Sequence, residues 1–157
     1  QPGFPADRHK NASKEQSENV LEASALAGRH IHHKIADNII AAIWRKYILN
    51  GYNITTARYN RTIGQLREDS ETAAQYETLV RESWLVSEAA GAGVPETSIN
   101  EIIDQFYHKL DPASTSSLQR DIWAGRPSEL ETFSGYLVRK AKELSVPVHY
   151  QKLCILT

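Results

Sequence analysis

Apolar residues recur three and four positions apart along most of this chain, and this spacing limits the possible folds more than any other feature of the sequence. Residues 37–52 and 128–146 each place aliphatic and aromatic side chains on one stripe of a helix. No segment alternates apolar and polar residues for long enough to predict a strand. The 157 residues suffice for one core. We therefore expect an all-α, single domain of about six to eight helices.

Glycine, proline and polar residues predict where the helices of the first half begin and end. A short helix is expected at about residues 14–27, followed by an extended or irregular stretch at residues 30–33. The next helix is expected at about residues 37–52, and the polar residues 53–56 weaken or end it. A loop or short helix should follow around residues 62–64.

In the second half of the chain, capping residues mark the helix starts. Asp69 or Ser70 can cap a long helix, which the glycines of residues 91–93 end before Pro95. Pro147 should end the last helix of this series. Two Ser-x-x-Glu sequences predict capping boxes, at Ser98 with Glu101 and at Ser128 with Glu131.

The N-terminal segment differs in composition from the rest. Residues 1–17 are polar and are interrupted by glycine and proline, so we interpret them as a tail or an interdomain linker, and residues 18–157 as the helical domain. The sequence contains no methionine and begins with Gln1. Because translation starts with methionine, we expect the chain to be a piece of a longer protein.

Charge and composition argue against several classes of protein. The formal net charge is −1, so the chain lacks the basic excess typical of nucleic-acid binders. No apolar run approaches the roughly 20 residues needed to cross a bilayer, and the polar N-terminal segment does not read as a signal peptide. A single cysteine, Cys154, excludes an internal disulfide and fits a reducing compartment. We expect a cytoplasmic protein that binds neither nucleic acid nor membrane.

The helix expected at residues 37–52 carries the first group of candidate site residues. Positions four apart on an α-helix lie about 40° from each other around the axis, so Lys46, Asn50 and Asn53 point from one face. We expect this face to lie opposite much of the apolar stripe formed by Ile39, Ile43 and Tyr47. A lysine beside two carboxamides could hold and polarise a small anionic oxo-acid. The alternative is a solvated helix face, which the spacing alone favours.

A second group of motifs lies in the last third of the chain. It reads Ser-Ser-Leu-Gln-Arg-Asp at residues 116–121, Gly-Arg-Pro-Ser-Glu-Leu-Glu at residues 125–131, and Leu-Ser-Val-Pro-Val-His at residues 144–149. Together with Trp-Arg-Lys-Tyr-Ile-Leu-Asn at residues 44–50, this order resembles the C-terminal domain of the ketopantoate reductase family. The resemblance extends from about Leu21 to the C-terminus.

The resemblance implies roles for individual residues. Lys46 matches the family's catalytic lysine, the general acid that protonates the oxygen when hydride reaches the ketone carbon. Asn50 matches the first of two family asparagines, which contacts substrate, and Ser117 matches a substrate-binding serine. Glu129 matches the glutamate at the junction of cofactor and substrate, so we include it among both the catalytic and the cofactor-binding residues.

One family position differs in this chain. The second family asparagine comes four residues after the first, where this sequence has Ile54, and Asn53 stands one residue early. Asn53 stays a substrate-binding candidate because its helical angle still points near Lys46. Structural explanations also remain open, since Ser117 could cap the turn that follows it and Glu129 lies in a first helical turn, where a carboxylate is favoured anyway.

The family's activity depends on a second domain. By resemblance, a longer parent protein reduces 2-dehydropantoate, also called ketopantoate, to pantoate with NADPH, which an N-terminal Rossmann domain binds through Gly-x-Gly-x-x-Gly. This sequence has no such motif, so we expect the chain alone to be inactive. Its expected partners are a small 2-keto acid and the missing Rossmann domain, with a homodimer as a further option.

Two other functions stay open. A non-catalytic helical module for interaction or dimerisation would show the same apolar stripes, and the departure at Ile54 favours this alternative. A zinc-binding helical module would rest on His30, His32 and His33 alone. Zinc prefers four ligands, the only cysteine is distant in sequence, and no Asp or Glu lies between these histidines, so we expect no metal.

Overall fold

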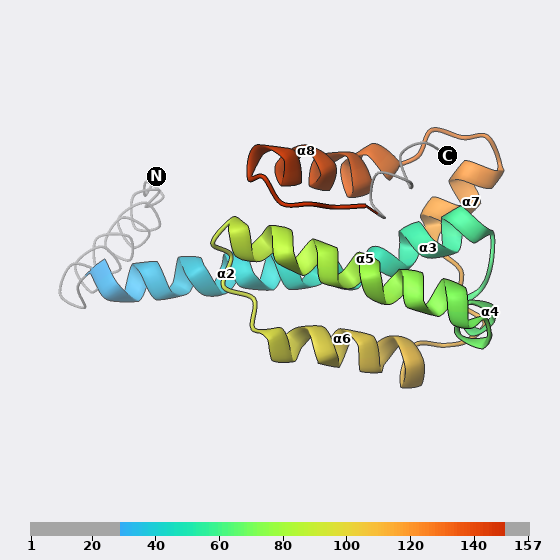
Figure 1. The fold of residues 1–157 in the computed structure, drawn as a ribbon, viewed down its shortest axis with the longest axis horizontal. Helices are drawn as coiled ribbons and strands as arrows, with labels where there is room; N and C mark the ends of the chain where they lie inside the picture. The colour runs from blue at the N-terminus through green and yellow to red at the C-terminus, as the bar shows by residue number, and fades with distance from the viewer. Residues whose placement is uncertain (1–28, 150–157) are drawn as a thin grey trace, which may run out of the picture. The chain divides into compact units, whose positions relative to one another are not determined.

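The structure, a computed structural model, describes the backbone of residues 29–149 and the side chains from Ile39 to His149 (Figure 1). Within these residues it consists of helices joined by turns, without a strand. This architecture confirms the all-α prediction. The elements are α2 (Arg29–Leu49), α3 (Gly51–Tyr59), α4 (Ile63–Glu68), α5 (Ser70–Ala89), α6 (Glu96–His108), α7 (Ser117–Trp123), the π-helical turn η1 (Glu131–Gly135) and α8 (Tyr136–Glu143).

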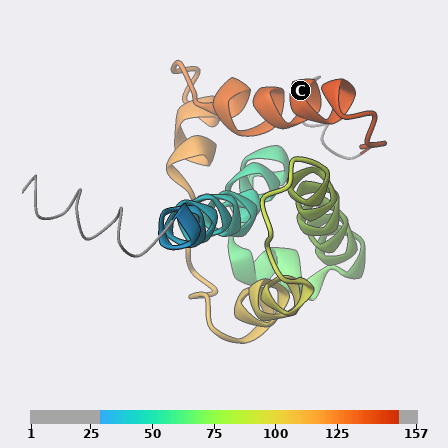
Figure 2. The same ribbon diagram turned by 90° about the vertical axis from the view of Figure 1, so that its left-hand side faces the viewer.

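The hydrophobic core is built around α5. The chain divides into two units, residues 1–39 and residues 40–157, and the core described here belongs to the second. Within it α5 packs against α3, α4, α6 and α8, and Figures 1 and 2 show α6 and α8 on different sides of α5. The Tyr76 ring of α5 stacks on the Phe106 ring of α6, with 4.1 Å between centroids. Buried around this pair lie Ile48, Ile63, Leu66, Val80, Ile99 and Ile102.

Side-chain caps fix the turns on both sides of α4. The Thr62 hydroxyl accepts from the backbone N–H of Gln65, and the Gln65 side chain accepts from the N–H of Thr62. Asp69 begins α5 by accepting from the N–H groups of Glu71 and Thr72 at 2.9 and 3.4 Å. Each bond satisfies an N–H group that a helix start leaves free. The cap at Asp69 confirms one of the two predicted alternatives.

The predicted helix ends are confirmed in the second half of the described chain. α5 ends at Ala89, before Gly91 adopts a left-handed φ of 72°. α8 ends at Glu143, four residues before Pro147. Among the described helices, none combines the length and the apolar content that crossing a bilayer requires.

α2 begins earlier than predicted but ends at Leu49, short of the predicted residue 52, so Lys46, Asn50 and Asn53 do not lie on one helix. It begins at Arg29, so residues 30–33 are helical, and the expectation of an extended or irregular stretch there is wrong. The histidines cost a helix only a fraction of 1 kcal/mol each, and no glycine or proline interrupts them. The helix predicted at residues 14–27 and the tail predicted at residues 1–17 lie outside the described residues.

The polar residues 53–56 do not end a helix, contrary to the prediction. The chain turns at Asn50 and continues as α3, in which Thr55 and Thr56 are fully buried. Their hydroxyls donate to the carbonyls of Gly51, at 3.2 Å, and Asn53, at 3.0 Å. Because these bonds satisfy the hydroxyls inside the helix, the polar side chains can face the core.

Neither predicted Ser-x-x-Glu capping box forms. Pro95 is the N-cap of α6, with φ −62° and ψ 143°, and the helix begins at Glu96 before Ser98 is reached. At the second sequence, Glu131 opens η1, and its carboxylate forms an ion pair with Arg139 instead of accepting from a backbone N–H. Both helix starts therefore lie at a different residue from the one that the capping pattern predicts.

Part of the apolar stripe of α2 faces away from the core. Ile39, Ile40 and Ile43 are 54%, 45% and 62% exposed, whereas Ile48 is fully buried. Ile39 and Ile43 precede Lys46 by seven and three residues, which places them on the same side of the helix as Lys46. The expectation that these isoleucines lie opposite the Lys46 face is therefore wrong.

Candidate functional site

The end of α2 and the start of α3 carry three of the predicted site residues. Lys46 lies in the last turn of α2 and is exposed, and Asn50 forms the turn between the helices, with φ −69° and ψ −1°. Asn53 lies in the first turn of α3, and both asparagines are half-buried. The N–H of Asn50 donates to the Lys46 carbonyl at 3.1 Å, and the N–H of Asn53 to the Asn50 carbonyl at 2.9 Å. These two hydrogen bonds fix the backbone between the three residues, from the end of α2 through the turn to the start of α3.

The start of α7 is bonded to this stretch. Ser116 is the N-cap of α7 and accepts from the N–H of Gln119 at 3.0 Å. Its hydroxyl also lies 2.8 Å from the Thr56 hydroxyl and 3.3 Å from the Asn53 carbonyl, to which it donates. Ser117 is the first residue of α7 and is exposed. The interpretation of Ser117 as the cap is therefore wrong, and Ser116 fills that role.

Glu129 lies on a third segment that packs against α3. It is exposed and precedes η1, and its carbonyl accepts from the N–H of Phe133 at 3.0 Å. Leu130 and Phe133, which follow it in the sequence, pack against the buried cluster around Ile54. α3 thus contacts both α7 and η1, so the segments that carry Ser117 and Glu129 are brought to the same short helix. A direct approach of the Glu129 carboxylate to Lys46 stays a prediction.

Tyr47 joins the end of α2 to η1. Its hydroxyl donates to the Phe133 carbonyl, and its ring centroid lies 6.4 Å from that of Phe133 and 6.2 Å from that of Tyr136. Burial, and then the neighbouring Tyr136, raise the pKa of Tyr47 well above its usual range. The phenol therefore stays neutral and keeps its proton to donate. Because Tyr47 follows Lys46 directly, this bond links the backbone beside the lysine to the turn that follows Glu129.

An apolar pocket of about 460 Å³ adjoins Tyr47. Rings from two helices meet there, with Trp44 and Tyr47 packed edge to face at 5.7 Å between centroids. We call it the aromatic pocket, and it is lined by Ile43, Trp44, Tyr47, Thr132, Tyr136 and Arg139. None of the predicted site residues lines it.

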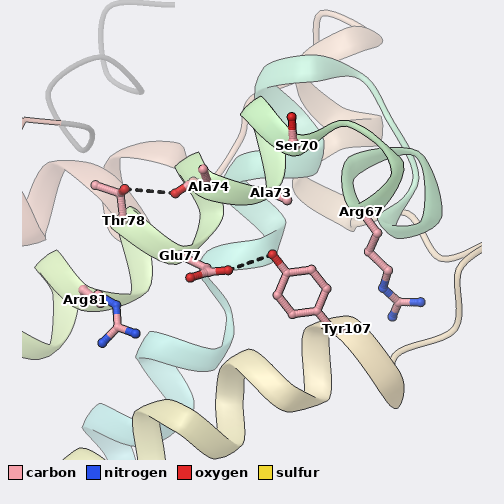
Figure 3. A pocket seen from close by; sticks show the side chains of 8 residues that line it. All are labelled: Arg67, Ser70, Ala73, Ala74, Glu77, Thr78, Arg81 and Tyr107. Atoms are coloured by element: carbon pink, nitrogen blue, oxygen red, sulfur yellow. Dashed lines mark hydrogen bonds between the residues drawn. The ribbon is translucent and has the colours of Figure 1, made fainter.

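A second, more polar pocket of about 540 Å³ lies along α5, between α4 and α6 (Figure 3). Arg67 lines one end, but its guanidinium donates to the carbonyls of Phe106 and Leu110, so it completes the end of α6. Tyr107 donates to Glu77 at 2.7 Å in the middle of the pocket, and burial together with this bond raises the pKa of Tyr107 to about 12. These contacts give Arg67, Glu77 and Tyr107 structural partners, and none of the predicted site residues lines this pocket.

Sequence reasoning missed the residues that join the segments on which the candidate site residues lie. Ser116 and Thr56 hold α7 to α3, and Tyr47 holds η1 to α2. The Ser-Ser pair at residues 116–117 contained a signal for a cap but did not show which serine would cap the helix. Among the described side chains, no group of three or more His, Cys, Asp or Glu residues could hold a metal ion. The side chains of the histidines at residues 30–33 lie outside the described part.

Known proteins of one family are similar to this chain in both sequence and fold. A family model described as the C-terminal part of ketopantoate reductase PanE/ApbA matches residues 38–155. The 2-dehydropantoate 2-reductase of Caulobacter vibrioides is 28% identical over 136 residues, which cover 85% of this chain and 46% of that protein. The corresponding enzyme of Streptococcus pyogenes is 25% identical over 132 residues, covering 83% and 43%. The chain thus spans less than half the length of these relatives.

Solved structures agree with the sequence comparisons. The dimeric ketopantoate reductase from Staphylococcus aureus superposes with a TM-score of 0.68 at 26% identity, over 74% of this chain and 40% of that one. The family member from Ralstonia eutropha gives a TM-score of 0.65 at 27% identity, over 73% and 38%. Because the family model covers most of the chain and the helices superpose, this chain belongs to the ketopantoate reductase family, whose C-terminal helical domain it contains.

Proposed function

We propose that this chain is the substrate-binding, lysine-bearing part of an NADPH-dependent 2-keto-acid reductase, with 2-dehydropantoate as its first expected substrate. One observation carries the proposal: Ser116 at the start of α7 is bonded to the Asn53 carbonyl and to Thr56. This contact joins two motif segments about 60 residues apart, and it supports a site formed by Lys46 and Asn50 with Ser117.

The proposed chemistry assigns one role to each residue. Lys46 donates a proton to the carbonyl oxygen while that oxygen gains negative charge, and its ammonium stabilises the charge. Asn50, Asn53 and Ser117 donate hydrogen bonds that hold the keto acid in place. Glu129 accepts hydrogen bonds from hydroxyl groups where substrate and cofactor meet.

The nicotinamide cofactor, when bound, supplies the hydride. This sequence contains no Gly-x-Gly-x-x-Gly, so its residues do not form the usual cradle for the pyrophosphate of a dinucleotide. We therefore assign cofactor binding to a Rossmann domain in a longer parent protein, with Glu129 as the contribution of this chain. The proposal includes a cytoplasmic location, which suits a chain with a single cysteine.

Self-association is part of the same proposal. The S. aureus relative is described as dimeric. We propose that this chain also pairs with a second copy. A purely interacting, non-catalytic module would keep this property while lacking the reductase activity.

The experiment that tests the reductase proposal is steady-state kinetics of the full-length protein with a 2-keto acid and NADPH. Lys46→Ala removes both the cation and the proton donor, so we expect turnover to fall on the order of 10²–10⁴-fold. Lys46→Arg should restore little, because guanidinium keeps its proton. Asn50→Ala should mainly raise KM, since an amide contact exists before and during the reaction.

Lys142→Ala is the matched control, because Lys142 is an exposed lysine in the last turn of α8. We expect it to leave both kcat and KM near their wild-type values. If Lys46→Ala keeps near-normal turnover and only weakens substrate binding, Lys46 is an anchor and the proposed proton transfer is wrong.

A further inference from the structure

Tyr47, which directly follows Lys46 in α2, reaches η1 with its side chain. Its ring is fixed by other rings, since its centroid lies 5.7 Å from that of Trp44, 6.4 Å from that of Phe133 and 6.2 Å from that of Tyr136. Its hydroxyl donates to the carbonyl of Phe133, 86 residues further along the chain. The ring contacts do not need the hydroxyl, so this hydrogen bond can be removed while the packing stays.

A second hydrogen bond continues from Phe133 to Glu129. The N–H of Phe133 donates to the Glu129 carbonyl at 3.0 Å, while the carbonyl of Phe133 accepts from Tyr47. Both ends of one residue are therefore bonded, one to the end of α2 and the other to the candidate glutamate. Two hydrogen bonds thus connect the residue after Lys46 to the backbone of Glu129.

The position of the Glu129 carboxylate depends on this backbone. The side chain is exposed, and no described residue forms a hydrogen bond or an ion pair with it. Such a carboxylate is placed only as well as the backbone that carries it. A misplacement of about 1 Å at a reacting group can cost about 10²-fold in rate, so a bond that fixes this backbone bears on the proposed reaction.

The turn that follows Glu129 has an unusual conformation. η1 is a five-residue π-helical turn, a rare conformation that is often found at functional sites. The Ser134 hydroxyl within it is fully buried and has no hydrogen-bond partner among the described residues, so it does not stabilise the turn. The bond from Tyr47 ties this turn to α2 from outside.

We infer that Tyr47 is a positioning residue for the proposed reduction: its hydroxyl holds η1 at the end of α2 and thereby sets the distance between Lys46 and the Glu129 carboxylate. Tyr47 itself touches neither substrate nor cofactor and acts through Glu129. The inference rests on the proposed function, because that function gives Lys46 and Glu129 a common substrate.

The first test measures the effect of the bond on η1 by amide hydrogen exchange in this chain. Tyr47→Phe keeps the ring and removes the hydroxyl, so we expect the N–H of Phe133 to exchange about tenfold faster than in the wild type. Tyr107→Phe is the matched control, because the Tyr107 hydroxyl also makes one hydrogen bond, to Glu77 at 2.7 Å, but in the polar pocket along α5. It should leave the exchange at Phe133 unchanged. If Tyr47→Phe also leaves it unchanged, the hydroxyl does not hold η1 and the inference is wrong.

The second test is steady-state kinetics of the full-length protein with 2-dehydropantoate and NADPH. We expect Tyr47→Phe to lower kcat/KM about tenfold, and Tyr107→Phe to leave kcat/KM at its wild-type value. In a Glu129→Ala background, Tyr47→Phe should lower kcat/KM no further, because the carboxylate that Tyr47 positions is gone. A hydroxyl that only stabilises the fold would lower kcat/KM by the same factor with and without Glu129.

The outcomes separate this inference from the reductase proposal. If Lys46→Ala and Glu129→Ala lose activity but Tyr47→Phe does not, or if Tyr47→Phe has the same effect in both backgrounds, the positioning role is wrong and the reductase proposal stands. A wild-type kcat/KM in Glu129→Ala overturns the positioning role together with the role of Glu129, while Lys46 is still judged by its own variant. A full-length protein that does not reduce the keto acid overturns both the proposed function and this inference.

Discussion

Asp69 lies where α4 ends and α5 begins, and its charge has three partners. The Arg61 guanidinium donates to it at 2.7 Å, and this bond, followed by those from the N–H groups of Glu71 and Thr72, lowers the pKa of Asp69. Because the pKa is lower in the folded state, the stabilisation is complete above the unfolded value of about 4 and is lost as the pH falls through the folded value. Asp69→Asn keeps a capping oxygen but removes the charge. We expect the variant to be less stable than the wild type at neutral pH.

The difference between Asp69→Asn and the wild type should shrink as the pH falls below about 4, where Asp69 also loses its charge. Urea denaturation midpoints across an acid series measure this. Glu88→Gln, at an exposed carboxylate in the last turn of α5, is the control and should lose no stability at neutral pH. A stability gap that is the same at neutral and acid pH would show that the Asp69 charge contributes nothing.

Single positions show how far the site could be predicted from sequence. The spacing predicted Lys46 and Asn50 on one helix, but the structure has only Lys46 in the last turn of α2 and places Asn50 in the turn that follows. At the departure from the family, the Ile54 side chain is buried in the cluster with Leu118. An asparagine side chain at position 54 would need hydrogen-bond partners inside an apolar cluster. Asn53 is only half-buried, so its side chain does not need buried partners.

At the scale of helices, the approach of α4 to the loop after α6 leaves room only for glycine. The N–H of Gly64 donates to the Pro112 carbonyl at 2.9 Å, and a Cβ on Gly64 would lie 2.9 Å from the Pro112 Cβ and 3.0 Å from its carbonyl oxygen. Gly64→Ala must push α4 and this loop apart. We expect it to lower the free energy of unfolding by about 1–3 kcal/mol.

The control for Gly64→Ala is Gly51→Ala, at the first residue of α3. A Cβ there would meet the Leu79 side chain at 3.4 Å, an ordinary contact, and alanine favours a helix. Its stability should stay within about 1 kcal/mol of the wild type, on the more stable side. Chemical denaturation of both variants gives the comparison. Equal free energies of unfolding for the two variants would mean that the loop after α6 moves to make room for the added Cβ without loss of stability.

Helix positions were predictable where a local side chain decides them, as at Asp69, and not where distant contacts decide them. Within α3 the hydroxyls of Thr55 and Thr56 bond to helix carbonyls, and Thr56 also bonds to Ser116, 60 residues away, a contact that no local pattern predicts. The π-helical η1 has no sequence signature, and the structure shows it held by the bond from Tyr47. Within the described residues, predictions from spacing therefore gave the helical type of the elements better than their ends.

At the scale of the whole molecule, the hydrophobic core is formed by side chains of this chain without a contribution from another protein. Among the described side chains, eleven large ones are fully buried, and they come from α2, α4, α5, α6 and α8. Burial of one such side chain contributes about 1.5–3 kcal/mol, which suits cooperative folding of this unit without further protein. We expect a single unfolding transition, with near- and far-ultraviolet circular dichroism changing together.

The same folded chain should reduce nothing. Catalysis in the proposed mechanism needs hydride held within reach of a keto acid at Lys46, and this sequence has no Gly-x-Gly-x-x-Gly to bind the dinucleotide pyrophosphate. We expect the purified chain with NADPH and 2-dehydropantoate to consume NADPH no faster than buffer. The unfolding transition is the control, because it separates an inactive folded chain from a misfolded one. Turnover by the folded chain, lost in Lys46→Ala, would mean that these helices bind the cofactor themselves, and the assignment of that task to a second domain would be wrong.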